Sequence, residues 1–271
     1  MSGYGGRDLL GALKKGETTL HYQPIMRLDC EDIQVVGHEA LLRWNHPRDG
    51  LLAAGRFLPA LDHPHVAAAA GRWVMKSAPA QYFAARGRSQ TLGLNVSPLE
   101  LCGRGFCRQL EAASEVASDA GGNLILEVLE GHPIDPDDLL QLARVARKLD
   151  ILLALDDYGV GFSTSEHRDL GVFDVVKIDR SFVPNTPRQM EEFARVAREI
   201  RAAKAVPLAE GIETAEEAEH VREAGVTLAQ GYFFGRPGPL ESLDEAMPEI
   251  AMADTRSDGP SARARASASE G

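Results

Sequence analysis

The sequence predicts an α/β fold, a modified TIM (β/α)8 barrel whose first strand is antiparallel to its neighbour. Two observations lead to this prediction. Eight short apolar segments recur over about 240 residues, and most of them alternate with helical patterns, as in a closed barrel. The first two segments are joined by a short polar link instead of a helix, which indicates an antiparallel pair. An open doubly wound sheet is the competing architecture.

The strand candidates differ in their connections. Segments 18–25 (TTLHYQPI) and 33–44 (IQVVGHEALLRW) flank the polar turn 26–32 and form the antiparallel pair. The later candidates are mostly continuous apolar runs, which are typical of parallel strands buried on both faces. These later strands are expected at residues 91–97, 123–130, 151–157, 174–179, 205–211 and 227–234.

Helical spacing of leucine, valine and alanine predicts helices over 135–150 and 188–204. In the first of these, acidic residues come early and basic residues late, an order that complements the helix macrodipole. A third helix is expected to begin at Thr214, which forms a capping box with Glu217, and to end at Gly225 in the C′ position.

Composition and charge exclude several classes of function. The 271 residues carry a formal net charge of −11, and no basic stripe offsets it, so we expect no binding to a nucleic acid polymer. No stretch of about 18 apolar residues is present, so we expect no membrane insertion. The N-terminus lacks a signal-peptide core.

The organisation is that of one domain followed by a tail. Residues 1–248 hold all the predicted elements, whereas Ser, Ala, Arg and Gly dominate residues 249–271, which we expect to be disordered. The three cysteines, Cys30, Cys102 and Cys107, fit no common zinc spacing. An odd cysteine count without a signal peptide favours reduced thiols and a cytoplasmic location.

Polar side chains lie at or near the ends of the predicted strands, where a parallel barrel collects its reactive residues. Five of them are carboxylates, and an asparagine adds an amide oxygen. Hard oxygen ligands of this kind suit Mg²⁺, Mn²⁺ or Ca²⁺. Divalent cations would also let two adjacent aspartates coexist at one strand end. The residues are Glu39, Asn95, Glu127, Asp156, Asp157, Lys177, Glu210 and Gln230.

There are more oxygen ligands here than one metal ion with open coordination positions needs. A carboxylate such as Asp156 can bridge two ions, and a two-metal site is the standard arrangement for attack on phosphorus. Lys177 would then orient water or neutralise charge, and Arg43 is placed to bind a phosphate oxygen. Taken singly, these residues have simpler interpretations: Lys177 could pair with Asp179, and Gln230 could be an ordinary buried amide.

Eight motifs in order resemble those of the EAL domain family, and the resemblance runs from about residue 8 to residue 245. It implies the modified barrel, hydrolysis of cyclic di-GMP to linear pGpG, two Mg²⁺ or Mn²⁺ ions, inhibition by Ca²⁺, and a homodimer. The motifs are YQPI (22–25), EALLRW (39–44), LNVSP (94–98), LEVLE (126–130), LDDYGVGFS (155–163), VKIDRSF (176–182), AEGIET (209–214) and QGYFFGRP (230–237).

The resemblance also implies a role for each matched residue. The catalytic residues are Lys177, Glu210 and Glu39, with Lys177 helping to position and deprotonate the attacking water. The first metal is held by Glu39, Asn95, Glu127 and Asp156. The second metal and its water are served by Asp156, Asp157 and Glu210. The substrate contacts are Gln23, Leu41, Arg43 and Gln230, with Gln230 also supporting the metal and water site. Glu130 braces the loop after Asp157, which couples the site to dimerisation.

One departure bears on activity. The loop that usually reads DFGTGYSS reads DYGVGFST here, so Val160 replaces a threonine hydroxyl. No metal ligand and no lysine is lost, which favours an active enzyme. The altered loop leaves a second hypothesis open, a module that binds cyclic di-GMP without cleaving it. A scaffold that binds no nucleotide is the third, and it gives no physical reason for a ring of carboxylates.

Overall fold

The computed structural model describes residues 4–29, 33–86, 90–101, 105–129, 134–158 and 171–243, with the backbone alone for Asp157. The predicted tail at 249–271, the domain boundary at 248, Glu130 and the altered loop around Val160 lie outside these residues, so they stay predictions.

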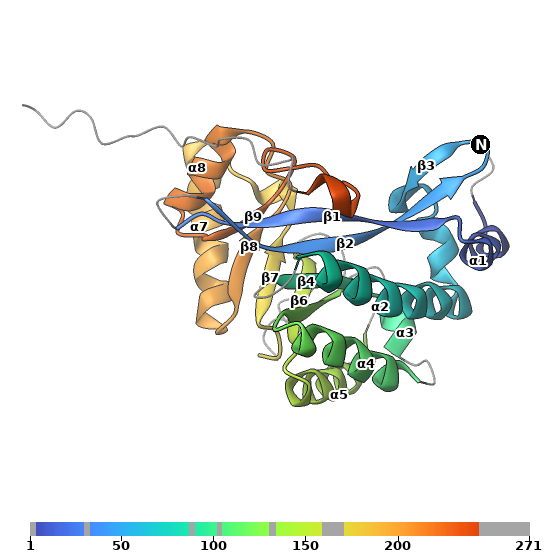
Figure 1. Ribbon diagram of the computed structural model, residues 1–271. Coiled ribbons are helices and arrows are strands. Elements are labelled where there is room, and N and C mark those ends of the chain that lie inside the picture. The colour runs from blue at the N-terminus through green and yellow to red at the C-terminus, as the bar shows by residue number, and fades with distance from the viewer. Residues whose placement is uncertain are drawn as a thin grey trace, which may run out of the picture.

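The strands form one sheet that closes into a barrel (Figure 1). β1 (Thr18–Arg27) pairs antiparallel with both β2 (Gln34–His46) and β9 (Leu228–Gln230), whereas the pairs from β4 to β9 and the β2–β4 pair are parallel. The closure confirms the modified barrel and rules out the open doubly wound sheet. The short β3 (Gly50–Ala53), which the sequence did not predict, pairs with β2 outside the ring.

The remaining barrel strands match the predicted segments to within two residues at each end. They are β4 (Thr91–Val96), β5 (Asn123–Val128), β6 (Leu152–Tyr158), β7 (Val175–Ile178) and β8 (Val206–Ala209).

The predicted ends of the first and last strands differ from the structure by two and four residues, in opposite directions. The polar link was expected to begin at Met26, but Met26 and Arg27 continue β1 and pair with β2. The last strand was expected to reach Phe234, but β9 stops at Gln230. The chain turns there, and the Phe234 amide donates to the Gly231 carbonyl at 3.1 Å. Aromatic residues are enriched in strands, so the aromatic residues after Gly231 led to a strand prediction where the chain turns.

Helices surround the sheet (Figure 1). The three predicted helices are found as α5, α7 and α8, each within two residues of the expected ends, whereas the sequence analysis did not delimit the others. The helices are α1 (Gly6–Lys15), α2 (Pro64–Arg86), α3 (Pro98–Leu101), α4 (Phe106–Asp119), α5 (Pro136–Lys148), α7 (Pro187–Ala202) and α8 (Ala215–Glu223). Short 3₁₀ helices are η1 (Ala54–Arg56), η2 (Leu58–Asp62), η3 (Arg180–Phe182) and η4 (Leu240–Ser242).

The capping box of α8 is confirmed. The Thr214 hydroxyl accepts from the Glu217 amide at 3.1 Å, and the Glu217 carboxylate accepts from the Thr214 amide at 3.1 Å. Gly225 follows the C-cap with φ +79°, the left-handed conformation that glycine adopts without strain. Over the described ranges, no helix combines the length and the hydropathy that a bilayer crossing needs.

The barrel interior is built in two layers. Strand residues with period two face the interior, and one set of these forms an apolar layer made of Ile25, Ile125, Ala154, Val175 and Leu208. In each parallel strand, the residue two positions further on shares that face and lies nearer the C-terminal end. Those residues are Glu127, Asp156, Lys177 and Glu210. In the antiparallel β1 the corresponding residue is Gln23, two positions before Ile25.

A β-bulge brings β2 into the same arrangement. Ile25 pairs with Gly37 and Met26 pairs with Val35, so Val36 is an extra residue in β2. Val36 packs on the interior apolar layer, and Glu39 reaches the polar layer above it. In a regular strand these two residues would face opposite sides, because they are three positions apart.

Candidate active site

The polar layer is organised around one buried lysine. The Lys177 ammonium Nζ lies 2.5 Å from Glu127 Oε2, 2.8 Å from Asp156 Oδ1 and 2.9 Å from Glu210 Oε1. Glu39 Oε2 is slightly further away, at 3.6 Å. Lys177 is 2% exposed, so its charge is compensated by these carboxylates and not by bulk water. The alternative ion pair with Asp179 is wrong, since Asp179 instead caps η3 by accepting from the Ser181 amide.

Two amide side chains hold the Glu39 carboxylate from its other side. Asn95 Nδ2 donates to Glu39 Oε1 at 2.5 Å, and Gln230 Nε2 donates to Glu39 Oε2 at 2.7 Å. Gln230 Nε2 also donates to Gln23 Oε1 at 3.2 Å, and Gln23 donates to the Gly235 carbonyl. Glu39 is therefore fixed by hydrogen bonds from two amides, whereas Glu127 accepts a hydrogen bond from Lys177, and Asp156 and Glu210 form ion pairs with it.

Burial and charge shift the pKa values of the cluster. Burial raises the pKa of Glu127 well above its usual range, and the Glu39 charge adds to this against the opposing ammonium. Burial likewise raises the pKa of Glu210 to about 8, again against Lys177. Burial alone would lower the pKa of Lys177, but Asp156 and the other three carboxylates outweigh it, and the pKa of Lys177 is raised.

Four carboxyl groups surround one ammonium, so the acidic groups of the cluster outnumber its cation. Among the described residues of the polar layer, two buried oxygens accept no hydrogen bond from protein atoms, Asp156 Oδ1 and Gln230 Oε1. Asp156 Oδ1 lies 2.8 Å from Lys177 Nζ but off the hydrogen-bond direction, so we treat this contact as an ion pair. Excess negative charge and unfilled oxygen acceptors are the features that divalent cations satisfy.

The side chains are not spaced as metal ligands around a common point. Within the part of the chain that the structure describes, no three His, Cys, Asp or Glu side chains could hold a metal ion as they stand. The Lys177 ammonium lies between the carboxylates in that place. The oxygen donors of this cluster fit a divalent cation chemically, but their present spacing does not. Binding of a cation therefore requires Lys177 or the carboxylates to shift.

Gly93 makes room for this arrangement. A Cβ at position 93 would overlap the Glu127 Oε1 atom, and Glu127 is itself held by Lys177 and 1% exposed. Gly93 belongs to none of the predicted site residues. Only its place in a predicted strand, two residues before Asn95, could have indicated it, because glycine inside a strand often marks a close approach.

A cavity of about 250 Å³ opens beside the cluster at the C-terminal ends of the strands. Sequence analysis did not single out two residues at its rim, Arg180 and Tyr232. Tyr232 is 49% exposed, and the Arg236 guanidinium lies 4.2 Å from its ring centroid. The lining residues are Gln23, Glu39, Arg180, Glu210, Gly211, Glu213, Gln230, Gly231 and Tyr232.

Arg180 fastens the loop that carries Glu210. Its Nη1 donates to the Gly211 carbonyl at 2.5 Å and lies 2.5 Å from Glu213 Oε1. Gly211 has φ +68°, and its missing side chain lets the Arg180 stem pack against it. The motif KIDR contained the signal for Arg180, three residues after Lys177, but a single arginine after a strand has many ordinary uses.

The predicted site residues fall into three groups. Brought together in the polar layer are Gln23, Glu39, Asn95, Glu127, Asp156, Lys177, Glu210 and Gln230. Leu41 and Arg43 do not line the 250 Å³ cavity, and Arg43 donates to the Leu42 carbonyl at 3.0 Å. Burial lowers the pKa of Arg43, which the Glu39 charge opposes. The Asp157 side chain and Glu130 lie outside what the structure describes.

Comparison with known proteins gives matches over most of the chain. A family model described as EAL domain matches residues 6–237. The cyclic di-GMP phosphodiesterase NbdA of Pseudomonas aeruginosa is 32% identical over 246 residues, which are 88% of this chain and 31% of that protein. The cyclic di-GMP phosphodiesterase RocR of the same organism is 29% identical over 239 residues, which are 86% of this chain and 60% of that protein. The chain thus spans less than two thirds of either relative.

Solved structures agree with these matches. The PaMucR phosphodiesterase in its c-di-GMP complex superposes with a TM-score of 0.74 at 27% identity, covering 88% of this chain and 98% of that one. The EAL enzyme Bd1971 with cAMP and cyclic-di-GMP bound superposes with a TM-score of 0.78 at 26% identity. The match covers 87% of this chain and 66% of that one.

Proposed function

The chain belongs to the EAL domain family, and on that basis we propose that it hydrolyses cyclic di-GMP to linear pGpG with divalent cations. The observation that carries the proposal is the cluster of four carboxylates around Lys177 at the mouth of the barrel, next to the cavity. Two phosphodiesterase relatives and the PaMucR complex support the choice of substrate.

Two Mg²⁺ or Mn²⁺ ions are part of this proposal. Bound there, the ions would lower the pKa of a water and offset charge on the phosphate. Ca²⁺ is expected to inhibit. The first ion would be held by Glu39, Asn95, Glu127 and Asp156, and the second by Asp156, Asp157 and Glu210.

The residues of the chain then perform the remaining steps. Lys177 helps to position and deprotonate the attacking water and balances charge, and Glu210, 2.9 Å from the Lys177 ammonium, serves the second ion and that water. The water oxygen forms a bond to phosphorus and one phosphorus–oxygen ester bond breaks. The leaving oxygen takes up the proton that the water gave up, which leaves a hydroxyl group. Gln23 and Gln230 line the cavity and hold the substrate there. Leu41 and Arg43, which lie outside that lining, are substrate contacts by family resemblance, Arg43 through a phosphate oxygen.

A homodimer completes the family-based proposal, with cyclic di-GMP as the small-molecule partner. The loop after Asp157, braced by Glu130, would couple the site to this dimer. Sedimentation of the purified chain at several concentrations tests the dimer, because a symmetric association depends on concentration. A single monomeric species at all concentrations would contradict it.

One observation favours a second function, a receptor that binds cyclic di-GMP without cleaving it. The Lys177 ammonium already compensates the carboxylates at 2.5–2.9 Å, so the cluster is held in place by protein atoms alone. In that case, nucleotide would bind in the cavity while the cations required for hydrolysis would not.

The deciding experiment is a product assay. Purified protein is incubated with cyclic di-GMP and Mg²⁺, Mn²⁺ or Ca²⁺, and pGpG is measured by chromatography. We expect product with Mg²⁺ or Mn²⁺, none with Ca²⁺, and none from the Glu39→Ala or Lys177→Ala variants. Glu111→Ala, which removes an exposed carboxylate of α4, is the matched control and keeps wild-type turnover. Full activity in either site variant contradicts the mechanism, and binding without product favours the receptor.

A further inference from the structure

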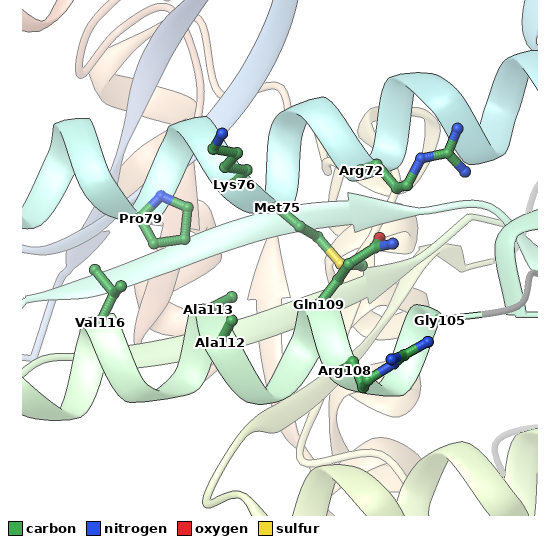
Figure 2. Close-up of a pocket in the computed structure, with 10 residues that line it drawn as sticks. All are labelled: Arg72, Met75, Lys76, Pro79, Gly105, Arg108, Gln109, Ala112, Ala113 and Val116. Atoms are coloured by element: carbon green, nitrogen blue, oxygen red, sulfur yellow. The ribbon is translucent and has the colours of Figure 1, made fainter.

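A second cavity lies outside the barrel, away from the polar layer. It is an open groove of about 600 Å³ between α2 and α4 (Figure 2). Its lining residues come from two turns of one helix and three turns of the other. They are Arg72, Met75, Lys76 and Pro79 of α2, and Gly105, Arg108, Gln109, Ala112, Ala113 and Val116 at and along α4.

The groove is cationic in an acidic chain. Arg72, Lys76 and Arg108 line it, and no lining residue is a carboxylate, although the whole chain has a net charge of −11. In Figure 2 Arg72 and Arg108 lie toward the Gly105 end of the groove. The lining of this end is therefore positively charged, and the exposed Glu111 and Glu115 of α4 are not among the residues that line it.

The other end of the groove is apolar. Pro79 and Val116 lie there in Figure 2, and Val116 is 39% exposed. Met75 and Ala113 are buried and form the floor. A methionine floor adapts to varied side chains, and arginine and methionine are enriched where proteins meet. The groove thus combines a cationic end with an apolar end.

We propose that this groove docks an acidic amphipathic helix of a partner protein. The lining of α4 runs from Gly105 to Val116, which is about 16 Å at 1.5 Å per residue, the length of three helical turns. The acidic side chains of the partner helix face Arg72 and Arg108, and its apolar side chains cover Val116 and the floor.

The open walls favour a helix over a small amphiphile. Arg72, Lys76, Arg108 and Ala112 are exposed, so a small molecule in the groove would keep much of its apolar surface in water. A helix satisfies its own backbone hydrogen bonds and covers the open side with its own width. The docking face requires no part of the proposed active site, so the two proposals can fail independently.

The test uses three synthetic peptides of about 12 residues, three turns of helix. The first has leucine at positions i, i+3, i+4 and i+7 with glutamate elsewhere, the second replaces glutamate by lysine, and the third replaces leucine by serine. Binding to the whole chain is followed by fluorescence anisotropy. We expect saturable binding of the first peptide only, weakened by added salt.

Two variants locate the binding. The charge reversal Arg72→Glu with Arg108→Glu is expected to weaken it at least tenfold, and Ala112→Trp, which fills the groove without changing charge, is expected to do the same. Lys14→Glu with Arg144→Glu is the matched control, since it reverses two exposed cations on α1 and α5 and leaves the groove intact.

Three results would overturn the proposal. They are no saturable binding of the acidic peptide, equal weakening by the control pair, and binding of sodium dodecanoate in the groove without binding of the peptide. The last result would assign the groove to a fatty-acid-like anion. Circular dichroism of each variant checks that the fold is kept, and the phosphodiesterase assay is not used as a readout.

Discussion

Gly231→Ala is expected to destabilise the fold strongly, because the glycine lies against backbone atoms that cannot rotate away. A Cβ at position 231 would overlap the amide nitrogen and carbonyl oxygen of Ile212. The loop that begins after β8 would have to move, and Glu210 begins that loop. The Ile212 amide donates to the Gln230 carbonyl at 3.1 Å, and the Phe233 amide donates to the Ile212 carbonyl at 3.0 Å.

The magnitude follows from these contacts. Overpacking of a buried position costs about 1–3 kcal/mol, and each of the two hydrogen bonds contributes about 0.5–1.5 kcal/mol. We therefore expect the free energy of unfolding to fall by about 2–6 kcal/mol, a large part of the 5–15 kcal/mol that is typical of domains.

Urea denaturation followed by tryptophan fluorescence measures the change. Gly55→Ala is the matched control, since a Cβ there meets no atom within 4 Å. The control is expected to stay within about 1 kcal/mol of the wild type. If the two alanine variants unfold at the same urea concentration, the reasoning from backbone overlap is wrong.

Three further predictions concern single positions. Gly93→Ala should lower the free energy of unfolding by about 2–5 kcal/mol in the wild type, but by under about 1 kcal/mol in the Glu127→Ala variant. Equal losses in the two backgrounds of this double-mutant cycle would contradict the overlap. Burial raises the pKa of Glu100 to about 7, so its charged form destabilises the fold, and wild-type stability should fall as pH rises from 4.5 to 7. Glu100→Gln should be more stable than the wild type by up to about 3 kcal/mol at pH 8 and equally stable at pH 4, as urea titrations at both pH values would show. Thr214→Ala should cost about 1 kcal/mol by thermal unfolding, and no loss would mean that the capping box is not needed.

The fold was predictable because the strand signals were local. Continuous apolar runs marked the parallel strands, and the short link marked the antiparallel pair. The bulge at Val36 was not predictable, because the pattern of β2 does not state which residue is left unpaired. α2 was not delimited either, since Gly71 and Pro79 interrupt a helical run that tertiary packing stabilises.

The residues of the site could be predicted from the sequence, but their arrangement in space could not. Polar residues near strand ends pointed to one cluster, which the structure brings together around Lys177. The central place of Lys177 between the carboxylates could not be read from the sequence, because side-chain direction and reach decide it. Arg180 and Tyr232 escaped notice for a related reason, as each reaches the cavity from outside the barrel interior.

The closure of the barrel sets the order in which the chain can fold. Ile25 in β1 pairs with Gln230 in β9, so β1 waits for β9, which is synthesised about 200 residues later. At roughly 5–20 residues per second, that delay is about 10–40 s. During this time, β1 and β2 can pair as a hairpin, but the outer edge of β1 stays open to other chains. Protection of that edge during synthesis, by a chaperone or by the hairpin twist, is therefore a requirement of this topology.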